Sequence, residues 1–324
     1  MTRWRAFAYV FFVILVAFGG PAAADDYPSR PVILIVPFPP GGGNDAMARL
    51  MAEKLGAALG QPFVVENRNG AGGSIGTRDA AKAAADGYTL LLAFSGTLAI
   101  NPSLYRNVGY DPQTDFAAIG LIASTPSVLV VNPAFPAATL PDLITYAKRN
   151  PGTIDYASSG VGTVVHVSME SFAAMAGITI NHIPYKGTGP AVTDLLGNHV
   201  SMMMPPLQPV IGHIKSGQLR AIAVASPTRS HLLPDLPTIA ESGVPGYSAS
   251  MRYGLVAPAG TPAVVIARLS KALNAALATE EVRMRLAAEG AEPLASTPEE
   301  YRADIARDQA FWAPLVKKLD LKVE

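Results

Sequence analysis

The sequence predicts an α/β protein of two lobes built on mainly parallel sheets. Segments typical of strands alternate with segments typical of helices in both halves of the chain, which is the pattern of α/β folds. About 300 residues follow an N-terminal leader, more than one hydrophobic core usually organises, so we expect two lobes. The 28 prolines and 29 glycines are spread along the chain, which favours many short connections over one disordered region.

Residues 1–24 have the pattern of a secretory signal peptide. Arg3 and Arg5 precede the apolar run 6–18, and three alanines that end at Ala24 supply the small residues of a cleavage site. A membrane anchor is the alternative, but this run is shorter than the ~20 residues that span a bilayer. We expect cleavage after Ala24 and a periplasmic protein without a lipid anchor, since the chain has no cysteine.

The mature chain carries little net charge. The full sequence holds 25 basic and 25 acidic side chains, and the leader contains two of the bases and no acid, which leaves a net charge of −2. This gives no electrostatic basis for binding nucleic acid or an anionic membrane surface. The five histidines form no metal-binding spacing and there is no cysteine, so we expect no metal and no cofactor.

The first candidate site is a glycine-rich turn between a strand and a helix. The aliphatic run 32–36 predicts a buried strand. The glycines at 41–43 would let backbone approach a ligand closely, and Asn44 or Asp45 would cap the helix 46–59. Because the free N–H groups at a helix start favour an anion, a carboxylate could bind here.

Two further turns follow in the same lobe. The turn 67–76, after the strand 63–66, misses the dinucleotide pattern GxGxxG because Ile75 stands in place of its last glycine. The strand 88–94 ends at Ser95 and Thr97, at the sheet edge where ligands of open parallel sheets bind. These hydroxyls are candidate donors to a carboxylate, and an ordinary helix cap explains them equally well.

The second lobe repeats this arrangement. The run 128–131 predicts its first strand, and Thr139 is placed to cap a helix over 140–149. The strand 154–157 then leads into a turn of hydroxyls and glycines, 158–163, in front of another helix. This turn is the second candidate anion site.

Two basic side chains lie near that turn. His166 falls in the first turn of the helix after Thr163, but an isolated histidine is more often a structural hydrogen-bonding group than a ligand contact. Lys186 follows the strand 180–184 and could pair with a substrate carboxylate, although a solvated surface lysine is the more ordinary explanation.

The C-terminal part returns to the first lobe. Thr261 and the proline after it would cap a helix, and Thr297 with Glu300 has the spacing of a capping box. Apolar positions up to Trp312 indicate a last helix packed on the lobe, with Trp312 in its core and an interruption near Pro314.

Nine segments in order resemble the Bug family, the TctC-like solute receptors of tripartite tricarboxylate transporters. They cover nearly all of the mature chain: PFPPGGGNDAMAR, VENRNGAGGSIG, DGYTLL, AINPSLY, YASSGVGT with the following His166, IPYKGTGPAVTDLLG, IKSGQLRAIAV, LPTIAESGVPGY and APAGTP.

The resemblance implies the fold of type II periplasmic binding proteins, with a ligand cleft between two α/β lobes. Residues 25–123 and 250–324 would form the first lobe and residues 124–249 the second. The protein would close on a small carboxylate, deliver it to a membrane permease and act as a monomer. Dicarboxylates, tricarboxylates, aromatic carboxylates and acidic amino acids all fit this expectation.

The resemblance also implies which residues face the ligand. From the first lobe these are Phe38, Gly42, Gly43, Asn44, Asp45, Ser95 and Thr97. From the second lobe they are Ser158, Gly162, Thr163 and the start of the helix that holds His166.

Two segments depart from the family pattern. The family commonly has an aromatic WxG motif where this chain has Arg252, Tyr253 and Gly254, and 204–206 replaces a loop that often holds a small or acidic residue. Arg252 could add a guanidinium for a second carboxylate, or be an ordinary surface charge.

Two other functions stay open from the sequence. A sensory receptor that presents its ligand to a histidine kinase would have the same fold and cleft. An exported hydrolase is less favoured because the chain has no GxSxG or SxxK motif and no cysteine.

Overall fold

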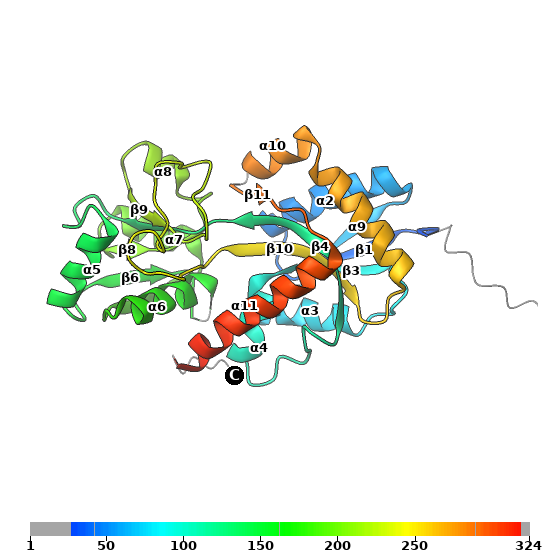
Figure 1. Cartoon of the computed structure of the whole chain (residues 1–324), viewed down its shortest axis with the longest axis horizontal. Coiled ribbons are helices and arrows are strands. Elements are labelled where there is room, and N and C mark those ends of the chain that lie inside the picture. Colours follow the sequence, from blue (N-terminus) through cyan, green and yellow to red (C-terminus); the bar gives the residue numbers. More distant parts are fainter. Residues whose placement is uncertain (1–26, 42, 162, 289, 319–324) are drawn as a thin grey trace, which may run out of the picture.

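The protein has two lobes, each built on one β-sheet with helices on both faces (Figure 1). A computed structural model describes residues 27–318 except 42, 162 and 289, so the predicted leader lies outside the described residues. The first sheet takes its strands from the chain up to residue 125 and from residue 251 onward, and the second from the chain between them. The predicted two-lobed α/β fold is confirmed, and the predicted boundaries at 123/124 and 249/250 stay predictions.

The first sheet has six strands in the spatial order β11-β4-β10-β3-β1-β2. They are β1 (Val32–Val36), β2 (Phe63–Asn67), β3 (Thr89–Phe94), β4 (Phe116–Thr125), β10 (Met251–Pro258) and β11 (Glu292–Pro293). β1 pairs in parallel with β2 and β3, whereas β10 is antiparallel to both β3 and β4. The prediction of mainly parallel sheets is wrong, because β4 leaves the first lobe and β10 returns to it, so these neighbours run in opposite directions.

Helices cover both faces of the first sheet. They are α2 (Gly43–Leu59), the short η3 (Ala71–Gly73), α3 (Ser74–Ala81), the π-helical turn η4 (Gly96–Ile100), α4 (Asn101–Leu104), α9 (Ala263–Leu277), α10 (Glu280–Ala288) and α11 (Pro298–Lys318). Successive side chains of β1 point to opposite faces, so Leu34 packs into the core with α2 and α9 while Ile35 packs with α3 and α11. Both faces are buried, which explains the unbroken aliphatic run of β1.

The second sheet has five strands in the order β7-β6-β8-β5-β9. They are β5 (Val128–Val131), β6 (Asp155–Ser158), β7 (Asn181–Pro184), β8 (Met202–Met203) and β9 (Arg220–Val224), covered by α5 (Leu140–Arg149), α6 (Val164–Ala176), α7 (Thr188–Leu196) and α8 (Ile211–Lys215). β6 is parallel to β7 and β8, and β5 is antiparallel to β8 and β9. Thr139 caps α5 as predicted, since its side chain accepts a hydrogen bond from the amide of Asp142 at 3.3 Å.

The last helix, α11, begins at the predicted capping box. The amide of Thr297 donates to Glu300 Oε2 at 2.8 Å, and the amide of Glu300 donates to Thr297 Oγ1 at 3.1 Å. The predicted interruption near Pro314 is wrong, because the helix continues to Lys318 and the buried Trp312 and Val316 hold the chain on either side of the proline.

Two details refine the predicted C-terminal region. Of the predicted Thr261 and Pro262 cap, Pro262 stands at the cap position of α9, and the hydroxyl of Thr261 donates to the carbonyl of Pro258 at 2.8 Å. α11 also lies so close to β10 that a Cβ atom at Gly254 would collide with the ring of Tyr301. This glycine is therefore required for the close approach of helix and strand.

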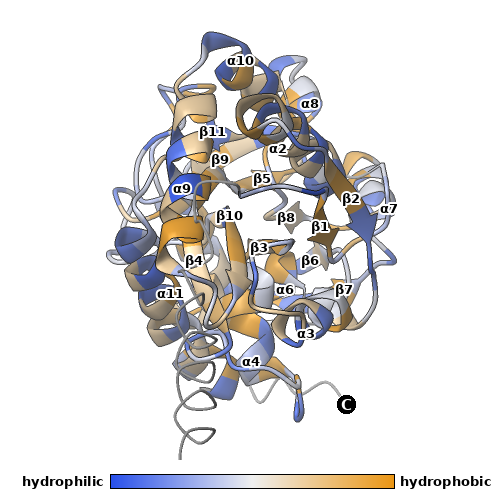
Figure 2. Ribbon diagram, turned by 90° about the vertical axis from the view of Figure 1, so that its right-hand side faces the viewer, coloured by the Kyte–Doolittle hydropathy of each residue, from blue (hydrophilic) through white to orange (hydrophobic). Residues whose placement is uncertain are grey.

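Apolar residues gather on the strands, whereas the outer helices carry polar faces. In Figure 2 the strands β1, β4 and β10 are mostly hydrophobic and α11 shows hydrophilic stretches. Across the described residues, no helix combines the length and the hydrophobicity that a membrane crossing requires.

Candidate functional site

A cavity of about 470 Å³ lies between the two lobes. The first lobe and its returning strand β10 contribute Phe38, Asn44, Gly72, Phe94, Gly96, Ile100, Asn101, Tyr105, Met251 and Tyr253. The second lobe contributes Ser159, Gly160, Val161, Thr163, Val164, Val165, Thr188 and Pro206. The lining residues that the structure describes include no Asp, Glu, Lys or Arg.

The second lobe presents the start of α6 to this cavity. Thr163 caps the helix with extended backbone, and its side chain accepts a hydrogen bond from the amide of His166 at 3.4 Å. The first N–H groups of a helix have no acceptor within it, and here they belong to cavity-lining residues, Val164 and Val165. The turn before the helix depends on Gly160, whose φ of 133° is rarely available to other residues. This face can hold an anion with uncharged donors.

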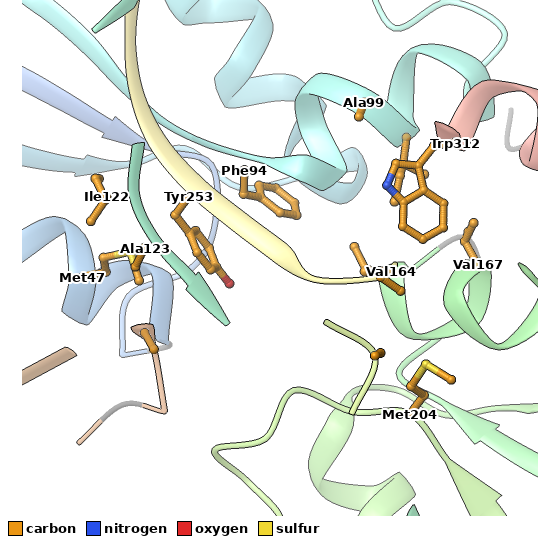
Figure 3. Close-up of a cluster of buried hydrophobic side chains, with 14 of the residues drawn as sticks. Met47, Phe94, Ala99, Ile122, Ala123, Val164, Val167, Met204, Tyr253 and Trp312 are labelled. Carbon is orange, nitrogen blue, oxygen red and sulfur yellow. The ribbon is translucent and has the colours of Figure 1, made fainter. Parts of the chain in front are cut away.

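The first lobe presents aromatic rings. Phe38 meets Phe94 edge to face with ring centroids 5.1 Å apart, and Phe94 stacks on Tyr253 at 6.2 Å. We call Phe38, Phe94 and Tyr253 the ring wall. Figure 3 shows Phe94 and Tyr253 beside each other, with Val164 of the second lobe on the α6 side. The wall offers a flat apolar surface on which a ring or chain could pack.

Two polar side chains next to the ring wall, Asn101 and Tyr105, form what we call the polar corner. Asn101 Nδ2 donates to the carbonyl of Gly72 and to Ser74 Oγ, both at 3.0 Å, which fixes the orientation of its amide. Burial raises the pKa of Tyr105, so its hydroxyl keeps its proton at neutral pH. No group of three or more His, Asp or Glu side chains within the described part of the chain could hold a metal ion.

The comparisons with known proteins agree with this architecture. The family model described as "Tripartite tricarboxylate transporter family receptor" matches residues 47–321. The chain belongs to this family. Together with the similarity to BugT and BugD, this match confirms the predicted resemblance to the Bug receptors.

Individual relatives cover nearly the whole receptor. Protein BugT of Bordetella pertussis (strain Tohama I) is 42% identical over an alignment of 325 positions, which covers 100% of this chain and 99% of BugT. The solved structure of the periplasmic binding protein BugD is 40% identical, covers 92% of this chain and 100% of its own, and has a TM-score of 0.76. The structure of R. palustris Rpa4515 with adipate is 37% identical, covers 90% of this chain and 98% of its own, and has a TM-score of 0.78.

Three of the predicted site residues line the cavity: Phe38, Asn44 and Thr163. Gly42 and Gly162 lie outside the described residues. The other predicted residues do not line the cavity.

Asp45 holds the first glycine-rich turn together and does not line the cavity. Its buried carboxylate accepts hydrogen bonds from the amide of Gly41 at 3.0 Å, from Asn67 Nδ2 at 3.0 Å and from Arg49 Nε at 2.9 Å. The hydrogen bond from Arg49 lowers the pKa of Asp45 to about 2, so this carboxylate is anionic. The predicted cap at Asn44 or Asp45 is wrong, because α2 already begins at the exposed Gly43, which does not line the cavity.

Ser95 and Thr97 are buried and do not line the cavity. Ser95 Oγ donates to Asp308 Oδ2 at 2.9 Å and accepts from the amide of Arg252 at 3.1 Å. Thr97 Oγ1 donates to the carbonyl of Phe94 at 3.1 Å. Both hydroxyls therefore stabilise the end of β3 and are not placed as ligand donors.

Ser158 and His166 are also buried, beneath the turn at Gly160, and do not line the cavity. Ser158 Oγ is 2.6 Å from His182 Nε2 and accepts a hydrogen bond from the amide of Gly160 at 3.1 Å. His166 is 3% exposed and stacks on His182 with ring centroids 3.9 Å apart. Burial and the neighbouring His182 lower the pKa of His166 to about 4, so the ring is neutral at pH 7.

Neither predicted cation lines the cavity. Lys186 is exposed outside it. Arg252 forms ion pairs with Asp304 and Asp308 of α11, with Nε 2.8 Å from Asp304 Oδ2. Side chains alternate along a strand, so Met251 and Tyr253 point into the cavity while Arg252 points to the opposite face of β10.

The three side chains of the ring wall were not predicted to lie together. Alternate residues of a strand face opposite sides, so a strand predicted over 251–253 would have placed Met251 and Tyr253 on one side and Arg252 on the other. No sequence pattern predicts the polar corner. Asn101 reaches the cavity because it directly follows the π-helical turn η4, and no sequence motif predicts such a turn.

Proposed function

We propose that this receptor closes its two lobes on a small carboxylate and delivers it to the membrane permease of a tripartite tricarboxylate transporter. The observation that carries the proposal is the cavity between the lobes, with the start of α6 on one face. Uncharged, oriented N–H donors can hold a carboxylate without a counter-ion that would itself have to be desolvated. The adipate named for Rpa4515 supports a carboxylate ligand.

The connections between the lobes support closure by a hinge. β4 and β10 run side by side from one lobe to the other (Figure 1), with Thr125 opposite Met251 and Ser124 opposite Arg252. Two adjacent strands that cross together can bend at the segments 123–127 and 249–253 while each sheet stays intact. The proposed domain boundaries fall within these segments.

The proposal is one of binding and release without catalysis. The ligand should therefore be recovered unchanged, and its capture should stabilise the native protein. Thermal unfolding of the mature protein in the presence of carboxylates and of the corresponding neutral amides tests this directly. We expect an increase in the unfolding temperature with some acids and none with their amides.

One substitution isolates the proposed donors. Val164→Pro removes one N–H group at the first position of α6, where proline is compatible with a helix, and Thr163 already has the extended backbone that precedes proline. We expect the best carboxylate of the screen to bind about tenfold more weakly or worse. Val164→Ala, which keeps the N–H group, is the matched control. Equal affinity in both variants would contradict carboxylate binding at α6.

A further inference from the structure

The two faces of the cavity differ in their chemistry. The second lobe contributes the start of α6 with the uncharged polar groups of Ser159, Thr163 and Thr188. The first lobe contributes the ring wall and Met251, and next to them the uncharged polar side chains of Asn44, Asn101 and Tyr105. A ligand that fills the cavity therefore meets the start of α6 on one side, and on the other an apolar ring wall flanked by uncharged polar side chains.

The charges around the cavity reinforce this difference. The first turn of α2 contains Asp45, a buried anionic carboxylate that already takes the amide of Gly41. The first turn of α6 contains no acidic residue. The helix start in the first lobe is thus less favourable for an anion than the helix start in the second lobe.

The first-lobe face offers no cation for a second negative charge. The cation nearest to the ring wall in sequence, Arg252, is on the other face of β10 and is already paired with Asp304 and Asp308. A carboxylate placed against Phe94 or Tyr253 would lose its water without gaining a cation, and the Asn101 amide already donates to Gly72 and Ser74. An apolar body at the same place would gain favourable contact area.

Resting on the proposed function, we infer that the preferred ligand is a monocarboxylate with a flat or elongated apolar body. Its carboxylate binds at the start of α6 and its body packs on the ring wall of Phe38, Phe94 and Tyr253. The ligand class is thus narrower than small carboxylates in general, and the orientation of the ligand between the lobes is fixed.

Matched pairs of acids test the inference by isothermal titration calorimetry on the mature protein. Hexanoate and adipate have the same chain length and differ by one carboxylate, as do benzoate and terephthalate on one ring. We expect the monocarboxylate of each pair to bind about tenfold more tightly or better. Tighter binding of adipate and terephthalate would overturn the inference while leaving the proposed carboxylate receptor intact. If none of the four acids bound, the result would count against the proposed function itself.

Variants of the wall locate the apolar body. Phe38 is a loop residue and only partly buried, so Phe38→Ala should leave the fold intact while weakening benzoate about tenfold. Met251→Arg places a cation next to the ring wall. It should change the ratio of adipate affinity to hexanoate affinity about tenfold in favour of adipate. Met284→Arg makes the same change at a residue that is 60% exposed on α10, and should leave the preference unchanged.

Both variants can contradict the inference. An unaltered preference in a folded Met251→Arg protein would place the second carboxylate away from the wall. Full benzoate affinity in Phe38→Ala would place the body of the ligand elsewhere. The unmodified protein with hexanoate and adipate decides the question even if Met251→Arg fails to fold.

Discussion

The buried His166 and the half-buried His182 form a stacked pair beneath the turn at Gly160. Their rings are nearly parallel, with an interplanar angle of 12°, and the far side of His182 stacks on Tyr156 at 5.0 Å. His182 also contacts Ser158, whose hydroxyl accepts from the amide of Gly160 in the turn. A charge on either ring would be partly desolvated and would repel the other, so both rings favour the neutral form.

The histidine pair predicts a loss of stability in mild acid. In the unfolded state the pKa of His166 is that of a free histidine, about 6.5, whereas burial lowers it to about 4 in the native state. The unfolded state therefore binds more protons between these values, and the free energy of unfolding falls as the pH drops from 6.5 to 4. His166→Gln should remove about 2–3 kcal/mol of this decrease. Urea unfolding at pH 7, 5.5 and 4 measures it.

A surface histidine provides the comparison. His199 is 72% exposed at its side chain, so His199→Gln is the surface control for the same substitution. If the free energy of unfolding depended on pH in the same way in both variants, His166 would not titrate differently in the native and unfolded states.

At the scale of elements, α11 ties the returning strand β10 to the end of β3. Asp304 and Asp308 pair with Arg252 of β10, and Asp308 also accepts a hydrogen bond from Ser95. These contacts join three segments that are far apart in the sequence, next to the proposed hinge. We therefore regard Arg252 as a residue that stabilises the fold.

Removal of Arg252 should be costly for the fold. Arg252→Ala leaves the mostly buried Asp308 without its cation and Asp304 with only the exposed Arg307, and we expect the free energy of unfolding to fall by about 3 kcal/mol. Arg307 also pairs with Asp304, but its side chain is 69% exposed, so Arg307→Ala should cost less than about 1 kcal/mol. Denaturant unfolding of both variants makes the comparison. Similar small effects would show that the buried pairs contribute little net stability.

The elements that local signals define could be predicted from the sequence. The strand 128–131, the helix 140–149 and the capping box at Thr297 agree with the structure because propensity, caps and apolar period act over a few residues. The direction of a side chain is different. Arg252 points away from the ligand cavity because Asp304 and Asp308 of α11, much later in the sequence, supply its carboxylates, and no local pattern contains that information.

At the scale of the whole molecule, one continuous core extends from the first lobe into the second. It includes Trp312 of α11 and Ala99 of η4 together with Val164 and Val167 of α6. Figure 3 shows Trp312 with Ala99 on one side and the two valines on the other. The C-terminal helix of the first lobe therefore contacts the binding face of the second, and Trp312 is 2% exposed there.

This contact makes Trp312 a reporter of the proposed lobe closure. The sequence has two tryptophans, and Trp4 lies in the predicted leader, so the mature protein would contain Trp312 alone. Opening of the lobes would move Val164 and Val167 away from the indole and expose it to water. Saturating ligand should then shift the emission of Trp312 to shorter wavelength and reduce the radius of gyration in small-angle scattering. Trp312→Phe should lose the emission change while its scattering still shows compaction. An unchanged spectrum and an unchanged radius with bound ligand would mean that the lobes do not move apart when the site is empty.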